Sequence, residues 1–112
     1  MADIKNMTYD TAIDLLKLKT LSTALNNRKH FILGYLTALC EEHFIRMEDF
    51  DLPVLAQIEY VRMKLMNEVK DIEEHSDPYD EDECHFKTDL YFAIDRLENF
   101  TVRITNAILA SY

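Results

Sequence analysis

Glycine and proline are scarce in this chain, and their scarcity constrains the fold more than any other feature. There is one glycine and there are two prolines in 112 residues, and neither Asn-Gly nor Asp-Gly, the dipeptides that favour tight β-hairpins, occurs. Apolar residues make up 48% of the chain, which is too apolar for an intrinsically disordered protein and enough for one core. The sequence therefore predicts an all-α protein whose residues 1–112 form a single domain.

The spacing of apolar residues predicts a four-helix bundle with a long C-terminal helix, its helices covering about residues 9–26, 28–47, 53–74 and 78–110. The third helix has the most regular apolar stripe, made of Val54, Ile58, Val61, Leu65, Val69 and Ile72. The stripe of the fourth helix consists of Phe86, Leu90, Ala93, Ile94, Leu97, Phe100, Ile104 and Ile108. On the first two helices the expected apolar faces contain Ile13, Leu15, Leu16, Leu18, Leu21, Leu25, Phe31, Ile32, Tyr35, Leu36, Leu39, Cys40, His43 and Phe44.

Gly34 and Ala38 form a strip of small residues inside the second predicted helix. Glycine in a helix interior costs about 1 kcal/mol relative to alanine, so close approach of another backbone is the simplest reason for its presence. The fourth helix, at roughly 40 to 50 Å, is longer than its neighbours, and a helix that overhangs its bundle favours a partner. A homodimer with Gly34 and Ala38 at its interface is therefore one candidate state.

Negative charge is concentrated in the middle of the chain. The formal net charge is −9, and residues 41–85 contain fifteen acidic and four basic residues, whereas residues 1–40 contain three acidic and five basic ones. Segment 71–83, DIEEHSDPYDEDE, is acidic at eight of thirteen positions. Such a field repels nucleic acid and anionic membranes and attracts basic proteins, so a basic protein is the expected partner and direct nucleic-acid or membrane binding is not expected.

The acidic residues fall into two groups with different explanations. Asp77 and Pro78 suit the start of the fourth helix. Acids in its first turn interact favourably with the helix dipole and stabilise the helix by about 0.3 to 1 kcal/mol each. The second group lies near the C-termini of the second and third helices and consists of Glu41, Glu42, Glu73 and Glu74. The helix dipole disfavours negative charge there, and function is expected at positions that break such a local rule. Tyr79, surrounded by charge, is typical of an interface anchor. The expected partner-binding residues are Glu41, Glu42, Glu73, Glu74, Asp77, Tyr79, Asp80, Glu81 and Asp82.

Motifs for catalysis and metal binding are missing from the sequence. There is no phosphate-binding glycine loop, no His-Glu-x-x-His and no Cys-x-x-Cys, so an enzyme is not expected and no cofactor is predicted. Cys40 and His43 are the one local thiol and imidazole pair, and core packing is the simpler explanation for them. The minor alternative is a metal site with zinc-type ligands but without their usual spacing, built from Cys40, His43, His75, Cys84 and His85.

A cytoplasmic binding protein is the function that these features favour. The N-terminus lacks the apolar core of a signal peptide, and the longest apolar run, residues 31–40, is about half of the roughly 20 residues that span a bilayer. In being small, acidic and helical, the chain is similar in composition, though in no motif, to bacteriocin and contact-toxin immunity proteins and to phage-encoded inhibitors of host defence. That similarity implies an inhibitor that covers a basic, nucleic-acid-binding surface of a partner protein. The alternative is a homodimeric assembly module whose acidic surface only keeps it in solution.

Overall fold

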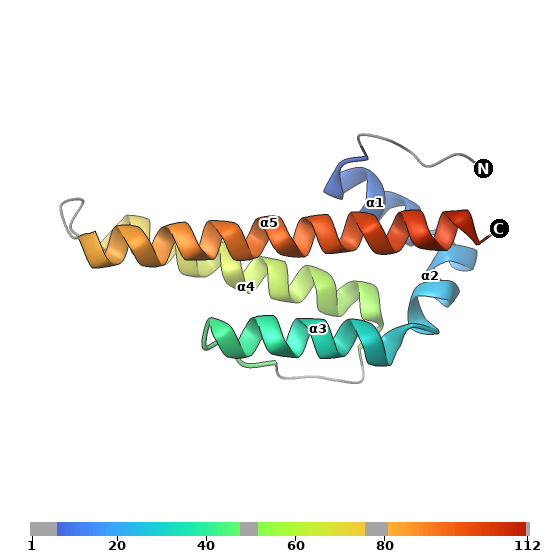
Figure 1. Ribbon diagram of the computed structural model, residues 1–112, viewed down its shortest axis with the longest axis horizontal. Coiled ribbons are helices and arrows are strands. Elements are labelled where there is room, and N and C mark those ends of the chain that lie inside the picture. Colours follow the sequence, from blue (N-terminus) through green and yellow to red (C-terminus); the bar gives the residue numbers. More distant parts are fainter. Residues whose placement is uncertain (1–6, 48–51, 76–80, 112) are drawn as a thin grey trace.

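Helix α5 (Glu81–Ala110) runs the length of the molecule, and the other helices pack along it (Figure 1). The computed structural model describes residues 7–47, 52–75 and 81–111, without the side chains of residues 75 and 81–84. The helices that precede α5 are α1 (Tyr9–Leu16), α2 (Lys19–Asn26), α3 (Lys29–Glu42) and α4 (Val54–His75). These described residues contain no strand, so the all-α class and the long C-terminal helix are confirmed.

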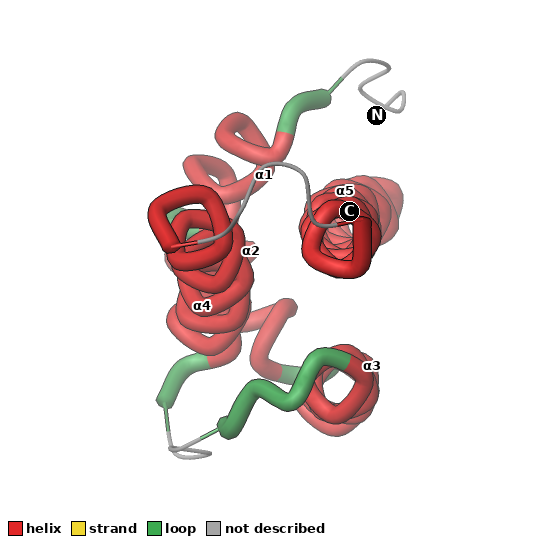
Figure 2. Tube along the Cα trace, turned by 90° about the vertical axis from the view of Figure 1, so that its left-hand side faces the viewer, coloured by secondary structure: helices red, strands yellow, loops and turns green. Residues whose placement is uncertain are grey.

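The helices surround one apolar core in an elongated molecule of 51 × 31 × 18 Å. Helix α4 lies antiparallel to α5, and α1 and α2 pack against the C-terminal half of α5 (Figure 1). The end-on view shows α3, α4 and α5 as three separate columns, with α1 above the seam between α4 and α5 (Figure 2). The half of the molecule where α4 ends and α5 begins is therefore covered by fewer helices than the half that holds the C-terminus.

The predicted helix 9–26 is wrong, because the chain forms two helices there and the described residues hold five helices rather than four. Leu18 interrupts the helix with extended backbone angles (φ −66°, ψ 136°), and its side chain is 56% exposed. On one continuous helix, Leu21 and Leu25 would point about 140° and 180° away from Leu16 at 100° per residue. The break turns Leu21 and Leu25 inward, where both are buried.

The predicted helix 28–47 is also wrong at its C-terminal end, since α3 stops at Glu42. The N–H of Ile45 donates to the carbonyl of Cys40 at 2.9 Å, and the N–H of Phe44 donates to Glu41 at 3.4 Å. These two bonds form a Schellman motif, a helix ending that requires a left-handed residue after the cap. Phe44 takes that conformation with φ 57°, and the chain turns so that Ile45 and Met47 pack against the core.

The core stripes of the two long helices match the sequence pattern closely. Five of the six predicted stripe residues of α4 are buried and Ile72 is partly buried. The stripe of α5 is buried or partly buried except for Phe86, which is exposed, so that prediction is wrong. Two buried threonines on α5 donate to carbonyls of their own helix at 2.8 Å, which removes the cost of burying their hydroxyls: Thr101 to Leu97 and Thr105 to Thr101.

Two contacts join helices that are distant in sequence. The Oδ1 atom of Asn26, at the end of α2, accepts a hydrogen bond of 3.1 Å from the N–H of Val54, the first residue of α4. Tyr35 of α3 and Phe100 of α5 stack with ring centroids 3.9 Å apart and planes 8° apart. The first contact caps a helix with a residue from another helix, and the second holds α3 against α5.

Candidate functional site

The structure places the predicted acidic residues at the ends of three helices. Glu41 and Glu42 close α3, Glu73 and Glu74 close α4, and Glu81 and Asp82 open α5. Figure 1 shows that α4 ends and α5 begins at the same end of the molecule, and that α3 runs toward that end. Asp77, Tyr79 and Asp80 lie outside the described residues, and the side chains of Glu81 and Asp82 are not described.

Glu73 and Glu74 interact with bases of the chain itself. The Nζ atom of Lys87 is 3.0 Å from Oε1 of Glu73, and the hydroxyl of Tyr91 donates to the same oxygen at 3.0 Å. These hydrogen bonds lower the pKa of Glu73 and raise the pKa of Tyr91. Glu74 is 3.9 Å from Nζ of Lys70 one turn earlier. Glu73 therefore connects α4 to α5, which gives it a structural role that the sequence pattern did not indicate.

Glu42 forms one wall of a surface hollow between the end of α3 and the middle of α5. The hollow has a volume of about 490 Å³ and is lined by Glu42, His43, Asp89, Phe92, Asp95 and Arg96. Nη2 of Arg96 is 3.3 Å from Oε2 of Glu42. Three carboxylates thus face a single guanidinium group, which leaves the lining acidic. We call this feature the α3–α5 hollow.

Two phenylalanines at or beside the α3–α5 hollow are exposed to solvent. Phe92 lines the hollow and is 63% exposed. Phe44 follows His43, another lining residue, and is 89% exposed, which overturns the expectation that it belongs to a buried stripe. Large apolar side chains that are left in water beside charged groups are typical of protein interfaces, where aromatic residues are enriched.

Sequence reasoning missed Asp89, Phe92, Asp95 and Arg96. The apolar stripe of α5 predicts which face of the helix meets the core and assigns no function to its polar face. One signal was present in the sequence, because Phe92 lies outside the stripe formed by Leu90, Ala93 and Ile94. An aromatic residue on the polar face of an amphipathic helix marks a surface that differs from an ordinary solvated face.

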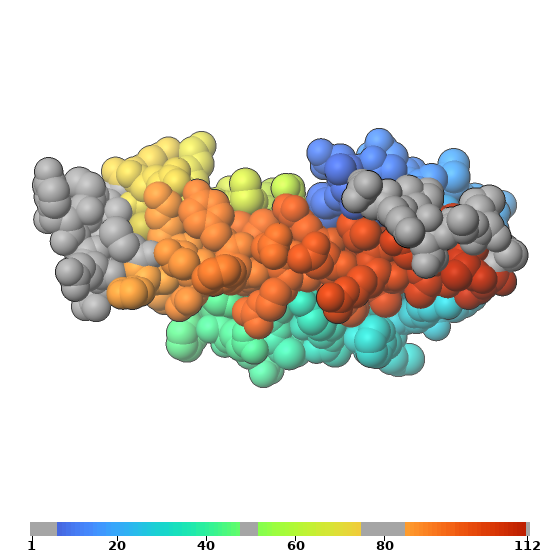
Figure 3. Space-filling model, turned by 45° about the horizontal axis from the view of Figure 1, so that its top comes forward, coloured from blue at the N-terminus to red at the C-terminus, as the bar shows by residue number. Residues whose placement is uncertain are grey.

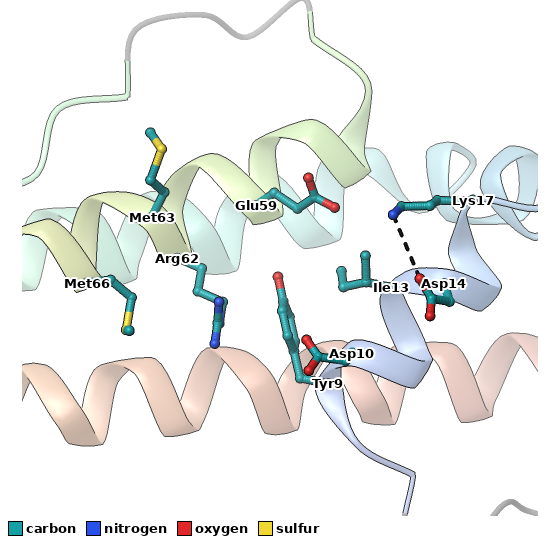
Figure 4. Close-up of a pocket in the computed structure, with 9 residues that line it drawn as sticks. All are labelled: Tyr9, Asp10, Ile13, Asp14, Lys17, Glu59, Arg62, Met63 and Met66. Atoms are coloured by element: carbon teal, nitrogen blue, oxygen red, sulfur yellow. Dashed lines mark ion pairs between the residues drawn. The ribbon is translucent and has the colours of Figure 1, made fainter.

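A second concave region lies between α1 and α4, and its lining residues are drawn in Figure 4. In the space-filling view, the surface is indented between α1 and the C-terminal part of α4 (Figure 3). The region has a volume of about 580 Å³ and its lining residues are Tyr9, Asp10, Ile13, Asp14, Lys17, Glu59, Arg62, Met63 and Met66. Acids and bases are mixed there, and Asp14 pairs with Lys17 at 3.7 Å, so the charges single out no class of ligand.

The chemistry of the α1–α4 region is set by Tyr9 and Arg62. The guanidinium carbon of Arg62 lies 4.6 Å from the ring centroid of Tyr9, and Arg62 also donates from Nε and Nη2 to Glu98 at 3.4 and 3.3 Å. Figure 4 shows Tyr9 pointing from α1 toward α4, with its hydroxyl end toward Arg62 and Glu59. Burial raises the pKa of Tyr9 to about 12, so its hydroxyl stays protonated at neutral pH. This arrangement holds α1, α4 and α5 together.

Gly34 and Ala38 lie on the exposed face of α3. A Cβ atom added at Gly34 would meet no heavy atom of the described chain within 4 Å. The close backbone approach inferred from glycine is therefore not made within the described part of the chain. Phe31, one turn before Gly34, is 65% exposed, so its predicted burial is wrong, although its ring lies 5.9 Å from Phe100.

Thiol and metal chemistry find little support in the described side chains. Cys40 is buried, and burial raises the pKa of its thiol to about 11, which keeps it protonated and unreactive at neutral pH. No three His, Cys, Asp or Glu residues among the described ones are grouped so that they could hold a metal ion. The side chains of His75 and Cys84 are not described, so the minor metal alternative is left as a prediction.

Comparison with known proteins assigns no function to these surfaces. No protein-family model, curated protein or solved structure matches it. No helix within the described ranges has the length and apolar character needed to cross a membrane. Its function is therefore inferred from the geometry and charge of its own residues.

Proposed function

We propose that this chain is a binding protein that receives a basic surface of another protein at the α3–α5 hollow and the neighbouring acidic helix ends. The observation that carries the proposal is an exposed aromatic side chain, Phe92, set among the carboxylates of Glu42, Asp89 and Asp95. An apolar ring provides contact area, and the surrounding carboxylates attract and orient a positively charged partner. Phe44 extends this apolar contact area beyond the hollow.

The conformation of Phe44 supports the proposal independently of charge. A left-handed conformation costs a non-glycine residue about 1 to 2 kcal/mol, and glycine or asparagine normally occupies this position. Phe44 has φ 57° and its ring is almost fully exposed, so packing within the described chain does not compensate for that cost. Contact of the ring with a partner is the use of Phe44 that the structure supports best.

The concrete form of the proposal is an inhibitor that covers a nucleic-acid-binding surface. Segment 71–83 and the acidic residues at the end of α3 would occupy positions that phosphates take on the partner. Glu73 contributes less than the sequence suggested, because it already pairs with Lys87 and Tyr91. In this form Asp89 and Asp95 are added to the predicted partner-binding residues.

The test is a pull-down with tagged protein from nuclease-treated native lysate at about 0.1 and 0.5 M salt, since screening weakens a charge-driven complex. Basic proteins are expected at low salt and should be depleted at high salt. Phe92→Ala and Phe44→Ala should each reduce recovery of the same proteins. Phe31→Ala is the matched control, because Phe31 is as exposed as Phe92 but lies at the start of α3, away from the hollow.

Two further outcomes separate the explanations. If Phe92→Ala and Phe44→Ala recover the basic proteins as well as Phe31→Ala and the native sequence do, the hollow is not the binding surface. Phe44→Gly distinguishes the role of the ring from that of the backbone conformation. Relief of the left-handed strain should stabilise the folded protein by about 1 kcal/mol, while loss of the ring should weaken partner recovery. Equal partner recovery with Phe44→Gly and the native sequence would assign no binding role to the ring.

A homodimeric assembly module is the second candidate, and one observation favours it. Phe31, Gly34 and Ala38 share an exposed face of α3 on which the missing Cβ of Gly34 leaves room. If this face forms the interface, sedimentation velocity should show a dimer that Ala38→Leu and Phe31→Ala abolish and that salt does not affect. A monomer at all concentrations would remove this candidate.

A further inference from the structure

The α3–α5 hollow already holds a guanidinium group, that of Arg96. The contact between Arg96 and Glu42 is a single hydrogen bond of 3.3 Å, and both side chains are more than half exposed, at 53% and 57%. By contrast, Arg62 donates from two nitrogens to Glu98, and both of those side chains are about one-third exposed. Arg96 is therefore held in the hollow by one exposed hydrogen bond, whereas Arg62 is held by two less exposed ones.

Two carboxylates of the hollow are left for an additional cation. Asp89 and Asp95 lie three residues before and three residues after Phe92, so their side chains flank its ring on the surface of α5. Asp95 accepts a hydrogen bond of 3.2 Å from Asn99, and neither Asp89 nor Asp95 forms an ion pair with a base in the described chain. Negative charge on both sides of one exposed ring is therefore uncompensated within the described residues.

His43 adds an unpaired ring nitrogen to the same lining. Its Nε2 atom is buried and has no hydrogen-bond partner in the described chain. A buried polar atom that is left without a hydrogen-bond partner costs about 1 to 3 kcal/mol. The hollow thus combines carboxylates, an unpaired imidazole nitrogen and an aromatic face.

We propose that the α3–α5 hollow is a recognition site for an arginine side chain. A guanidinium group donates to carboxylates through several nitrogens and stacks on an aromatic ring. Asp89 and Asp95 offer the carboxylates, and Phe92 offers the ring. Lysine has a compact, strongly hydrated charge and uses such a site less well. Arg96 pairs with Glu42 in the same hollow, and its positive charge limits the affinity of the free protein for a second cation. This assignment rests on the proposed function only for the identity of the partner as a basic protein.

The test uses three peptides of the same uncharged sequence that carry three arginines, three lysines or three citrullines, titrated into isotopically labelled protein. The arginine peptide should shift the NMR signals of His43, Phe92 and Asp95 and bind about fivefold or more tightly than the lysine peptide. The citrulline peptide, which has the shape of arginine without its charge, should not bind. Equal affinity for the arginine and lysine peptides would reduce the site to a diffuse acidic surface.

Variants assign the parts of the site. Arg96→Gln removes the resident cation and should tighten binding of the arginine peptide several-fold, whereas Phe92→Ala should weaken it about tenfold. Lys19→Gln, at the start of α2 and away from the hollow, makes the same change of net charge as Arg96→Gln and is the control. Weaker binding by a folded Arg96→Gln variant would overturn the proposal, because Arg96 would then be building the site. If the arginine peptide binds but the pull-down recovers no basic protein, the arginine site stands and the proposed function is wrong. If the pull-down recovers a basic protein but the arginine peptide does not bind, the proposed function stands and the arginine site is wrong.

Discussion

Tyr9 is the residue at which burial and chemistry oppose each other most directly. Its hydroxyl is buried without a hydrogen-bond partner in the described chain, and burial raises its pKa to about 12. An unpaired buried hydroxyl costs about 1 to 3 kcal/mol, whereas the ring itself contributes apolar contact and the interaction with Arg62. The oxygen atom is therefore the unfavourable part of a favourable side chain.

Tyr9→Phe should raise the free energy of unfolding by about 1 kcal/mol at pH 7, measured by urea denaturation. The folded-state pKa lies above the unfolded value of 10.0, so the folded chain retains a proton that the unfolded chain loses. The stabilisation that comes from this proton is complete below about pH 10 and is lost as the pH rises toward 12. Phenylalanine has no proton to lose, so the free energy of unfolding of Tyr9→Phe should fall less over this pH range. Tyr60→Phe is the control, expected to change stability by less than about 0.5 kcal/mol. A destabilised Tyr9→Phe variant would show that the hydroxyl has a partner.

Which residues are buried was predictable where a helical period extends over several turns. Val54 to Val69 could be assigned from spacing alone, because each residue of the stripe meets the core at the same angle. Phe44 could not be assigned, since nothing in its neighbours predicts a left-handed phenylalanine where glycine normally ends a helix. The α3–α5 hollow could not be predicted either, because it exists only where the end of α3 meets the polar face of α5.

At the scale of elements, α4 begins where α2 ends, and Asn26 makes that connection. The hydrogen bond from the N–H of Val54 to Asn26 satisfies one of the donors that a helix N-terminus leaves unpaired. The capping residue normally precedes its helix directly, whereas Asn26 is 28 positions away. One donor at the start of α4 is therefore satisfied by a distant residue rather than by the residue that precedes the helix.

Asn26→Ala should lower the free energy of unfolding by about 1 kcal/mol and speed amide exchange in the first turn of α4. Asn26→Asp keeps the acceptor and adds a charge that the helix N-terminus favours, so it should retain or increase stability. Urea denaturation of both variants, with hydrogen exchange for the first turn, measures the difference. If alanine and aspartate behave alike, water caps this helix instead of Asn26.

The extents of the helices were predictable to different degrees for physical reasons. Helices expected over about residues 53–74 and 78–110 lie at Val54–His75 and Glu81–Ala110. Both have a long apolar period, and Pro53 directly precedes the first of them. The boundary between α1 and α2 could not be predicted from turn residues, because it falls at Lys17 and Leu18 and neither glycine nor proline stands there. The signal was the phase of the apolar residues, which shifts by about half a turn between Leu16 and Leu21.

At the scale of the whole molecule, charge opposes folding. The net charge of −9 is a source of self-repulsion, while the ion pairs at the surface contribute about 0 to 1 kcal/mol each. Arg62 and Glu98 form the least exposed of the ion pairs in the described chain. Most of the carboxylates therefore raise the energy of the compact state rather than lowering it.

Raising the salt concentration from about 0.05 to 0.5 M should increase the free energy of unfolding by about 1 kcal/mol, because the screening length falls from about 14 to 4 Å. Urea denaturation at both salt concentrations gives the change. A double variant, Asp89→Asn with Asp95→Asn, carries two fewer negative charges and should respond less. Lower stability at high salt would mean that the ion pairs outweigh the self-repulsion.

The uneven covering of α5 has a consequence for how the molecule opens. Figure 1 shows α1 and α2 beside the C-terminal half of α5, whereas α4 is the helix beside its N-terminal end. Segments with fewer packed neighbours open at lower free energy, so amide hydrogens near Lys87 should exchange long before those near Thr105. Local opening of the thinly covered end leaves the core of the other half intact. A partner that docks at the thinly covered end can therefore reshape this part of the chain at a free-energy cost far below that of global unfolding.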